Sequence, residues 1–193
     1  TQQAKFVAAD GAALDLFGCS VALSGDTAIV GAYTDDAAFA DQGSAYIFTR
    51  TGTTWTQQAK LTASDAAAND YFGWTVAIDG ATAIVGAFGD NAGAGAFQGS
   101  AYIFTRTGTT WTQQAKLTAP DAAALDYFGV AVGVSGDTAI VGMFQDDIGS
   151  NIDQGSAYVF TRNSGGNVWT QQAKLVSSEG TTSDSFGRAV SVS

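Results

Sequence analysis

The sequence predicts an all-β protein made of β-propeller blades, each with four antiparallel strands. Three segments recur in register: WTQQAKL, TAIVG and GSAYIFTR (GSAYVFTR in its last copy) each occur three times in the 193 residues. No stretch shows the i, i+3, i+4 spacing of an amphipathic helix. Polarity rises from the first to the last strand of each repeat. Because inner propeller strands crowd around an axis while outer strands meet water, this gradient favours blades over a β-sandwich.

Each repeat supplies its four strands in a fixed order. The first strand follows a Phe-Gly pair and alternates large and small apolar residues, as in 74–78. The second, Thr-Ala-Ile-Val-Gly, is apolar on both faces, as expected of a strand covered on both sides. The third carries Tyr46 and Phe48 on one face, and the fourth, WTQQAKL, is half polar. Three complete blades are expected at about 17–61, 72–117 and 128–175 within one propeller segment, 1–193.

Half-repeats flank these blades. Residues 1–6 are expected to form the last strand of a preceding blade, and residues 186–193 the first strand of a following one. Three blades fall below the 4–8 of closed propellers. We therefore expect either a piece of a longer repeat array or an assembly of several chains, with self-association through the exposed end blades.

Composition excludes several classes of function. Eighteen acidic and eight basic residues give a formal net charge of −10, which argues against nucleic acid and anionic lipid as partners. The absence of histidine removes Ser-His and Cys-His nucleophile arrangements. No apolar run approaches the ~18 residues of a membrane span. The sequence therefore predicts a protein that is not an enzyme and has no membrane span in this segment.

Phe-Gly, a hydrophobic strand, Val-Gly-Ala and then Gly-Ser-Ala-Tyr resemble the FG-GAP repeat of integrin α-subunit propellers and bacterial surface proteins. The full matches are FGCSVALSGDTAIVGAY, FGWTVAIDGATAIVGAF and FGVAVGVSGDTAIVGMF. The resemblance implies an extracellular or cell-surface module for adhesion or protein binding. Two features depart from the family. The family's Gly-Ala-Pro has no proline in this chain, where Tyr33, Phe88 and Phe144 stand at that position. Its calcium loop between the first two strands is here a short hairpin turn, so those calcium residues have no counterpart.

An acidic pair precedes every Phe-Gly. One interpretation is a cation site or a general acid with its partner. The other is that short Asp side chains cap backbone N–H groups in the turn that enters the next blade, and repetition in every blade favours capping. The pairs are Asp10 and Asp15, Asp65 and Asp70, Asp121 and Asp126, and Glu179 and Asp184.

The loops between second and third strands vary between blades, which suits a surface that is free to specialise. Adjacent carboxylates and loop carbonyls are possible ligands for a hard cation such as Ca²⁺, although nothing matches the EF-hand spacing. A solvated acidic loop is the alternative. The candidate metal ligands are Asp35, Asp36, Asp41, Asp90, Asp146, Asp147 and Asp153, and the candidate ligand-contact residues are Asp35, Asp36, Asp90, Asn91, Asp146 and Asp147.

Four tryptophans and one cysteine remain. Trp55, Trp111 and Trp169 occupy the same place in each outer strand, which favours blade-to-blade packing over a row for stacking sugars. Trp74 is expected to fill an irregular space near the blade entrance. Cys19 holds the equivalent position in the first blade and is expected to pack as a small apolar residue.

The loops and the links to the next blade should emerge on one side of the antiparallel blades. They contain fifteen of the eighteen acidic residues. We therefore expect an acidic face that contacts a protein or glycan ligand, or calcium, through the loops 33–42, 88–98 and 144–154. Two other functions stay open: a structural subunit of a surface fibre or array, and an accessory propeller of a larger secreted enzyme. The opposite side carries Asp26, Asp79 and Asp137 with Arg50, Arg106 and Arg162.

Overall fold

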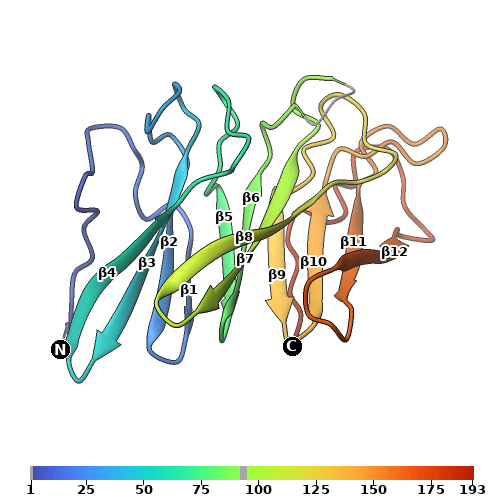
Figure 1. Cartoon of the computed structure of the whole chain (residues 1–193). Helices are drawn as coiled ribbons and strands as arrows, with labels where there is room; N and C mark the ends of the chain where they lie inside the picture. The colour runs from blue at the N-terminus through green and yellow to red at the C-terminus, as the bar shows by residue number, and fades with distance from the viewer. Residues whose placement is uncertain (1, 92–94) are drawn as a thin grey trace.

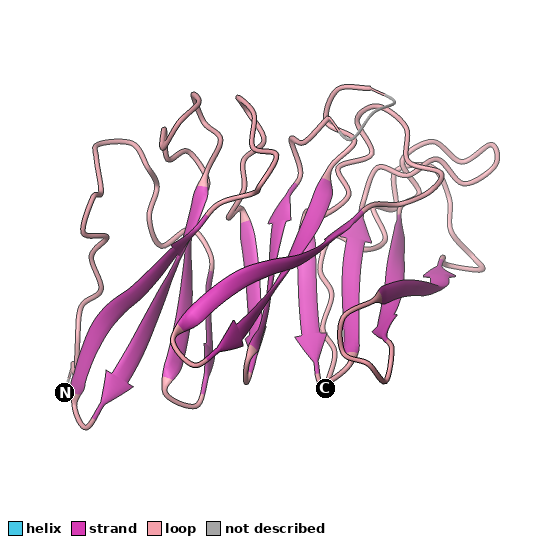
Figure 2. Ribbon diagram, in the orientation of Figure 1, coloured by secondary structure: helices cyan, strands magenta, loops and turns pink. Residues whose placement is uncertain are grey.

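The computed structural model describes residues 2–91 and 95–193, and within them the chain is all-β, with twelve strands and no helix (Figures 1 and 2). The strands form three four-stranded antiparallel sheets, and within each sheet the strands follow chain order. This arrangement confirms the prediction of propeller blades. No helix in the described part of the chain has the length and apolar character that crossing a membrane requires.

Each sheet is one blade. Blade 1 contains β1 (Val21–Ser24), β2 (Thr27–Ala32), β3 (Ser44–Thr51) and β4 (Thr54–Leu61). Blade 2 contains β5 (Thr75–Asp79), β6 (Thr82–Ala87), β7 (Ser100–Thr107) and β8 (Thr110–Leu117). Blade 3 contains β9 (Ala131–Ser135), β10 (Thr138–Met143), β11 (Ser156–Arg162) and β12 (Trp169–Leu175).

The blades are arranged as a fan. The inner strand β5 contacts β1 on one side and β9 on the other extensively, whereas the outer strands β4 and β8 barely touch. Long loops gather at one end of the strands and tight hairpins at the other (Figure 1). We call the first end the loop face; it carries the loops 33–42 and 144–154, residues 88–91 and 95–98 of the loop 88–98, and the links between blades. Residues 92–94 of the predicted contact loop lie outside the described residues. The Asn69 N–H donates to the Ala40 carbonyl (2.9 Å), which ties a link to a loop on this face.

A β-bulge lies at the two consecutive glutamines of each outer strand, and only the first of them pairs with the neighbouring strand. Ile47 pairs with Ala59 and Phe48 pairs with Gln57, so Gln58 between them has no partner in the sheet. The same irregularity recurs in the other two blades. Because a bulge turns its extra residue out of the ladder, Gln58 is directed toward the following blade.

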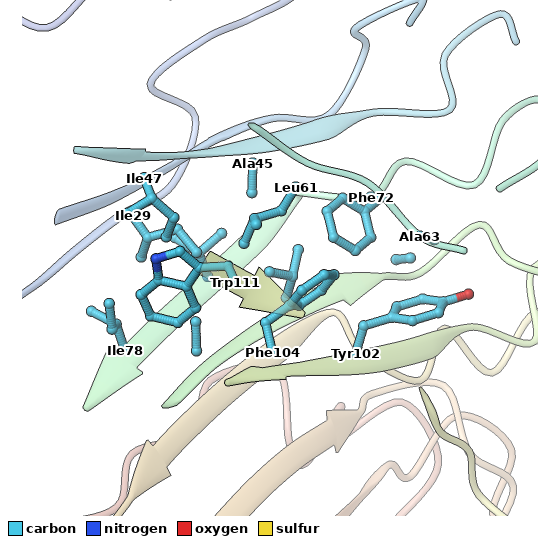
Figure 3. Close-up of a cluster of buried hydrophobic side chains, with 14 residues drawn as sticks. Ile29, Ala45, Ile47, Leu61, Ala63, Phe72, Ile78, Tyr102, Phe104 and Trp111 are labelled. Carbon is cyan, nitrogen blue, oxygen red and sulfur yellow. The ribbon is translucent and has the colours of Figure 1, made fainter. Parts of the chain in front are cut away.

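The hydrophobic core lies between blades rather than inside any one of them. Ile29, Ile47 and Leu61 of blade 1 pack against Phe104 and Trp111 of blade 2, and all are buried (Figure 3). A second cluster repeats this packing between blades 2 and 3. Each blade therefore depends on its neighbour for burial of its apolar surface, as in other repeat proteins.

Glycines allow the backbones of successive blades to approach closely. The N–H of Phe72, at the entrance to blade 2, donates to the carbonyl of Gln42 in blade 1 (2.9 Å). A Cβ on Gly86 would overlap the carbonyl oxygen of Gly129, the Phe-Gly glycine of the next blade. The Val-Gly glycine of one blade and the Phe-Gly glycine of the next thus lie in direct contact, and the backbone around each leaves no room for a side chain.

The expectation of a strand at 1–6 and another at 186–193 is wrong for the residues that the structure describes, which exclude residue 1. Residues 2–7 and 188–193 form no strand, because the middle strands of their blades are not beside them. The N-terminal segment still packs where an outer strand would: the Phe6 ring stacks on Phe48 with 4.8 Å between centroids and lies 5.1 Å from Trp55.

Replacing Gly86 with alanine should lower the free energy of unfolding by at least about 3 kcal/mol, because the new Cβ overlaps backbone that cannot move without separating blades 2 and 3. Gly80→Ala is the matched control: its Cβ meets open space, and only its positive φ of 55° is unfavourable, at a cost of about 1 kcal/mol. Urea unfolding measures both. Equal losses in the two variants would show that the close approach is not the limiting contact.

Candidate binding face

Each blade holds a lysine between two carboxylates and a tyrosine at the base of the loop face. In blade 2, the Lys116 Nζ lies 2.7 Å from Asp65 Oδ2 and 2.6 Å from Asp90 Oδ2. The Tyr102 hydroxyl donates to Asp90 (2.8 Å), with Asp65 Oδ1 at 3.1 Å. Asp65 comes from the link that leaves blade 1, so this network joins two blades. The equivalent sets are Lys60 with Asp10, Asp35 and Tyr46, and Lys174 with Asp121, Asp146 and Tyr158.

The protonation states of this network follow from its geometry. Partial burial opposes the charge of Lys116, but the hydrogen bonds that its ammonium donates to Asp65 and Asp90 outweigh this effect and raise the pKa of the lysine. The same lysine lowers the pKa of Asp65 despite some desolvation. Burial, together with the charge of Asp90, raises the pKa of Tyr102 far above its ordinary value. The lysine is therefore a cation, the tyrosine is neutral and Asp65 is ionised at neutral pH.

The second acid of each pair caps the link, as the capping interpretation predicted. Asp70 Oδ2 accepts the N–H of Ala67, three residues earlier, at 2.6 Å. Asp15, Asp126 and Asp184 accept the N–H groups of Ala12, Ala123 and Thr181 in the same way. The first acid of three pairs differs from the capping interpretation: Asp10, Asp65 and Asp121 each pair with a lysine that lies about 50 residues further along the chain.

Burial raises the pKa of two of these caps. Asp70 has a pKa of about 6, chiefly because it is desolvated, and the charge of Asp90 adds to the effect. Asp126 also has a pKa of about 6, through desolvation and the charges of Asp146 and Asp147.

The three variable loops share one closure. Asp36 Oδ1 accepts the N–H of Asp41 (2.7 Å), and Asn91 Oδ1 accepts that of Phe97 (2.9 Å). Asp147 Oδ1 closes the third loop on Asp153 (2.9 Å). The closing residue has a positive φ each time, 50° to 57°. Asn and Asp are equivalent in this role, since only the acceptor oxygen is used.

The sequence-predicted contact residues divide into two groups. Asp35, Asp90 and Asp146 are buried, and each pairs with a lysine beneath the loops. The remaining candidates lie in the outer parts of the loops: Asp36, Asn91 and Asp147 are exposed, and Asp41 and Asp153 are half-buried. Within residues 2–91 and 95–193, no cluster of three or more His, Cys, Asp or Glu side chains is arranged to hold a metal ion.

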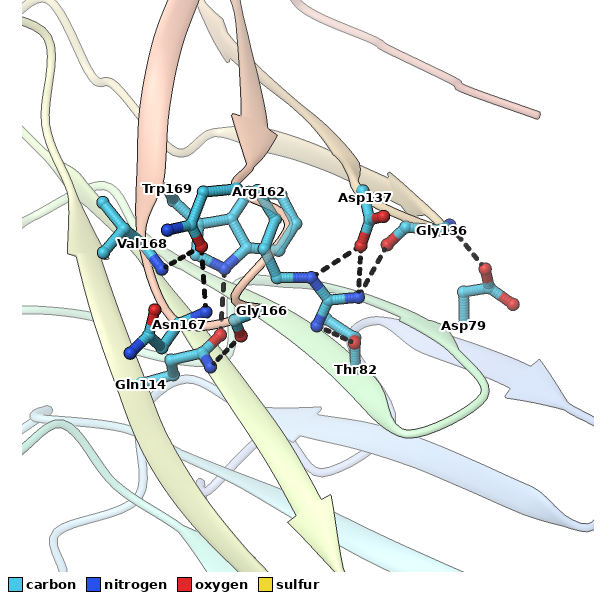
Figure 4. A network of polar contacts seen from close by, with 11 residues as sticks. Asp79, Thr82, Gln114, Gly136, Asp137, Arg162, Gly166, Asn167, Val168 and Trp169 are labelled. Atoms are coloured by element: carbon cyan, nitrogen blue, oxygen red, sulfur yellow. Dashed lines mark hydrogen bonds and ion pairs between the residues drawn. The ribbon is translucent and has the colours of Figure 1, made fainter.

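Two of the three outer-strand tryptophans, Trp111 and Trp169, pack between blades, as expected, whereas Trp55 packs against Phe6 of the N-terminal segment. The Trp111 Nε1–H donates to Gln58 Oε1 of blade 1 (3.0 Å), and Trp169 donates to Gln114 of blade 2 (3.0 Å). Figure 4 shows the second of these contacts beside Arg162, whose guanidinium lies over Trp169 and reaches Thr82 of blade 2. Arg162 also pairs with Asp137 on the hairpin side, 2.7 Å away.

A row of aromatic rings crosses all three blades on the loop face, and sequence reasoning missed it as a unit. Tyr71 stacks on Phe88 (5.0 Å between centroids), and Tyr127 stacks on Phe144 (5.5 Å). Trp74 joins the row edge-on, 4.9 Å from Phe88. The row begins at Tyr33 and ends with the Arg188 guanidinium over Phe144. The signal in the sequence was the aromatic residue after each Val-Gly-Ala or Val-Gly-Met, together with Tyr-Phe-Gly in two repeats.

Two hollows flank Trp74, which is 37% exposed. The first has a volume of about 510 Å³ and includes Phe17, Cys19 and Tyr33 in its lining. The second, of about 320 Å³, is walled by Phe88, Tyr127, Phe144 and Arg188, among others. Desolvation raises the pKa of the Cys19 thiol, whose Sγ–H donates to the Gly73 carbonyl.

Comparison with known proteins identifies the repeat. The FG-GAP repeat matches residues 1–48, 55–104, 111–160 and 169–193. The chain belongs to the FG-GAP repeat family. FG-GAP repeats are typical of extracellular proteins, and their propellers are generally non-catalytic. In these FG-GAP repeats, the Phe-Gly pair is the point where successive blades meet.

Among solved structures, the crystal structure of Sqt1 from Saccharomyces cerevisiae, a WD40 propeller, is similar, with a TM-score of 0.53 and 8% identity. The match covers 83% of this chain and 36% of Sqt1, so the chain spans about a third of that protein. At this identity the likeness shows the fold alone. No curated protein matches the FG-GAP chain.

Replacing Lys116 with methionine should lower the free energy of unfolding by about 2–4 kcal/mol, because it leaves two carboxylates beneath the loops without their cation. Arg50→Met removes a cation from an exposed pair with Asp26 and should cost less than about 1 kcal/mol. Chemical unfolding at pH 7 compares them. A Lys116 loss no larger than the Arg50 loss would contradict a structural role for the lysine network.

Asp70→Asn should stabilise the protein at pH 7 but not at pH 4. The folded-state pKa of about 6 lies above the unfolded value of 3.8, so the parent loses stability as pH rises from about 4 to 6, and asparagine removes that loss while keeping the acceptor for Ala67. A gain of about 1–3 kcal/mol at pH 7 is expected. Unfolding measured at both pH values tests this, with Asp15→Asn as the equivalent cap in blade 1. An Asp70→Asn gain that is the same at both pH values would contradict the titration.

Proposed function

We propose that this chain is a non-catalytic extracellular binding module that contacts a protein ligand through its loop face. The observation that carries the proposal is the asymmetry of charge: fifteen of the eighteen acidic residues lie in the loops and links of one side. The three lysines beneath them neutralise only part of that charge. A field of this kind attracts basic partners over roughly the Debye length of ~8 Å at physiological salt.

The aromatic row supports a basic protein segment as the ligand. It lies on the loop face, at the start of the loops that carry Asp36 and Asp147. A guanidinium already rests on one of its rings, since Arg188 Cζ is 5.6 Å from the Phe144 centroid. Aromatic rings attract cations in this way and also bury the apolar stems of Arg and Lys. The loops would guide the ligand, and the row around Trp74 would hold its side chains.

Paired charge variants test the loop face. Asp36→Asn with Asp147→Asn removes two exposed charges, and Asn91 shows that asparagine closes this loop equally well. Asp26→Asn with Asp137→Asn removes two exposed charges from the hairpin side. Binding to immobilised basic extracellular-matrix proteins should weaken about 3- to 10-fold in the loop variant, with a smaller dependence on salt. The hairpin variant should bind like the parent.

Trp74→Ala tests the aromatic row separately from the charge of the loops. It should weaken the same binding without changing its salt dependence, because it removes contact area rather than charge. Equal affinities for the loop and hairpin variants would place the ligand elsewhere. A glycan array probes the other ligand class, and calorimetry with CaCl₂ probes calcium contact through the acidic loops.

A structural subunit of a surface fibre or array is the second candidate function. It is favoured by the apolar end face of blade 1, where Val21 and Leu23 are exposed.

A further inference from the structure

The chain builds the same blade-to-blade junction twice. At the first junction, Val76 and Ile78 of β5 are 6% and 8% exposed because they pack against blade 1. The surface that covers them includes Ile29, Ile47 and Leu61. The second junction repeats this arrangement with Val132 and Val134 against Ile84, Ile103 and Leu117.

One half of this junction is open at the N-terminal end. Val21 and Leu23 of β1 hold the positions of Val76 and Ile78, yet they are 67% and 64% exposed. Together with Ala28 and Val30 they line a hollow of about 460 Å³ beside Phe6. We call Val21, Leu23, Ala28 and Val30 the front face.

The other half is open at the C-terminal end. Ile140, Val159 and Leu175 of blade 3 hold the positions of Ile29, Ile47 and Leu61. Their counterparts are fully covered, whereas Ile140 and Val159 are half-buried and Leu175 is 39% exposed. We call Ile140, Val159 and Leu175 the back face.

Polar groups at the two ends are complementary as well. Glu179 corresponds to Asp65, which pairs with the lysine of the following blade, but Glu179 forms no ion pair within the described residues. The Trp55 Nε1–H corresponds to that of Trp111, yet it donates to no residue that the structure describes. Gln172 corresponds to the acceptor Gln58 and is on the side where such a tryptophan would arrive.

The two ends of the chain also carry the same segment. Residues 1–24 align without a gap on residues 170–193: both begin Thr-Gln-Gln-Ala-Lys and reach Phe-Gly at the same spacing. A junction between two copies therefore needs only one of these segments, and the other is redundant. Residues 2–7 and 188–193 belong to no strand, so few sheet hydrogen bonds oppose their displacement, and the bond that the Phe186 N–H donates to the Gln154 carbonyl (2.8 Å) would be remade by the incoming Phe17 N–H.

We infer that a second copy of this chain docks head to tail, with the front face of one copy on the back face of the other, in the register of the internal junctions. Phe17–Ser24 of the incoming copy takes the place of residues 186–193. Leu175 takes the place of Phe6 on Phe48 and Trp55. Glu179 pairs with Lys60 of the incoming copy, and Gln172 accepts from Trp55.

This interface is heterologous, so each copy offers one front and one back face. Two copies joined twice form a ring of six blades, within the 4–8 of closed propellers. The inference does not depend on ligand binding, because the front and back faces lie at the ends of the fan and not on the loop face.

The experiment is light scattering after size exclusion over a range of concentrations, with two end-face variants. The front variant carries Val21→Glu and Leu23→Glu, and the back variant carries Val159→Glu and Leu175→Glu. The control variant, Leu125→Glu with Ile152→Glu, adds the same charge at residues of the loop face that are 51% and 59% exposed. Thermal melting checks that each variant folds, and Leu175→Glu alone replaces the back variant if Val159→Glu disturbs β11.

The parent and the control should double in mass as concentration rises, and each end-face variant alone should stay a monomer. An equimolar mixture of the front and back variants should form dimers, because one intact front face then meets one intact back face. Larger species with the same dependence on both faces would support the junction without ring closure. A monomeric parent at all concentrations, or a front variant that still assembles alone, would overturn the inference.

Discussion

Successive blades meet backbone to backbone, and the rest of the structure is arranged around that contact. The Phe72 N–H of blade 2 donates to the Gln42 carbonyl of blade 1 (2.9 Å), and the carbonyl oxygen of the next Phe-Gly glycine, Gly129, lies where a Cβ on Gly86 would be. This approach fixes the distance between inner strands. Phe72 and Phe128, which precede the Phe-Gly glycines, are fully buried as a result. The core therefore lies between sheets, and a blade without a neighbour leaves its apolar face open to water.

On the loop face, neighbouring aspartates differ in burial and in the contacts that they make. Asp35 is buried and pairs with Lys60, while Asp36 next to it is exposed and closes its own loop. The buried acid costs desolvation, which the lysine and Tyr46 offset through charge and hydrogen bonding. Negative charge on this side thus has two origins: one set of carboxylates is buried and holds blades together, and another is exposed in the loops.

The sequence was informative where a feature repeats within one stretch of chain. Strand order, the Asp15-type caps and the packing of Trp111 all follow from local pattern and from repetition in register. Pairing over distance was not visible: nothing local to Asp65 indicates that Lys116, some fifty residues later, is its partner. The same holds for the bulge at Gln58, because a ladder irregularity leaves no mark on a strand that alternates regularly.

The aromatic row shows a different limit. Tyr71 and Tyr127 have positive φ values of 55° and 56°, which few non-glycine residues adopt. The positive φ therefore sets the direction of each ring, and the amino-acid sequence does not predict a positive φ at a tyrosine. Two consecutive aromatic residues, as in Tyr71-Phe72, read as ordinary core, yet one ring is buried between sheets and the other lines the loop face.

The hydrogen bond that closes each loop separates the loop residues, which vary between blades, from the strands, which do not. A single side-chain oxygen, on Asp36, Asn91 or Asp147, ends each loop on a residue held at positive φ. The described residues enclosed by that bond belong to no strand, and their carbonyls accept from the links between blades, as Ala40 does from Asn69. The sequence of each loop can therefore vary from blade to blade while the strands and the lysine networks beneath stay the same. The three loops accordingly differ in sequence, whereas the strands on either side of them are nearly identical in all three blades.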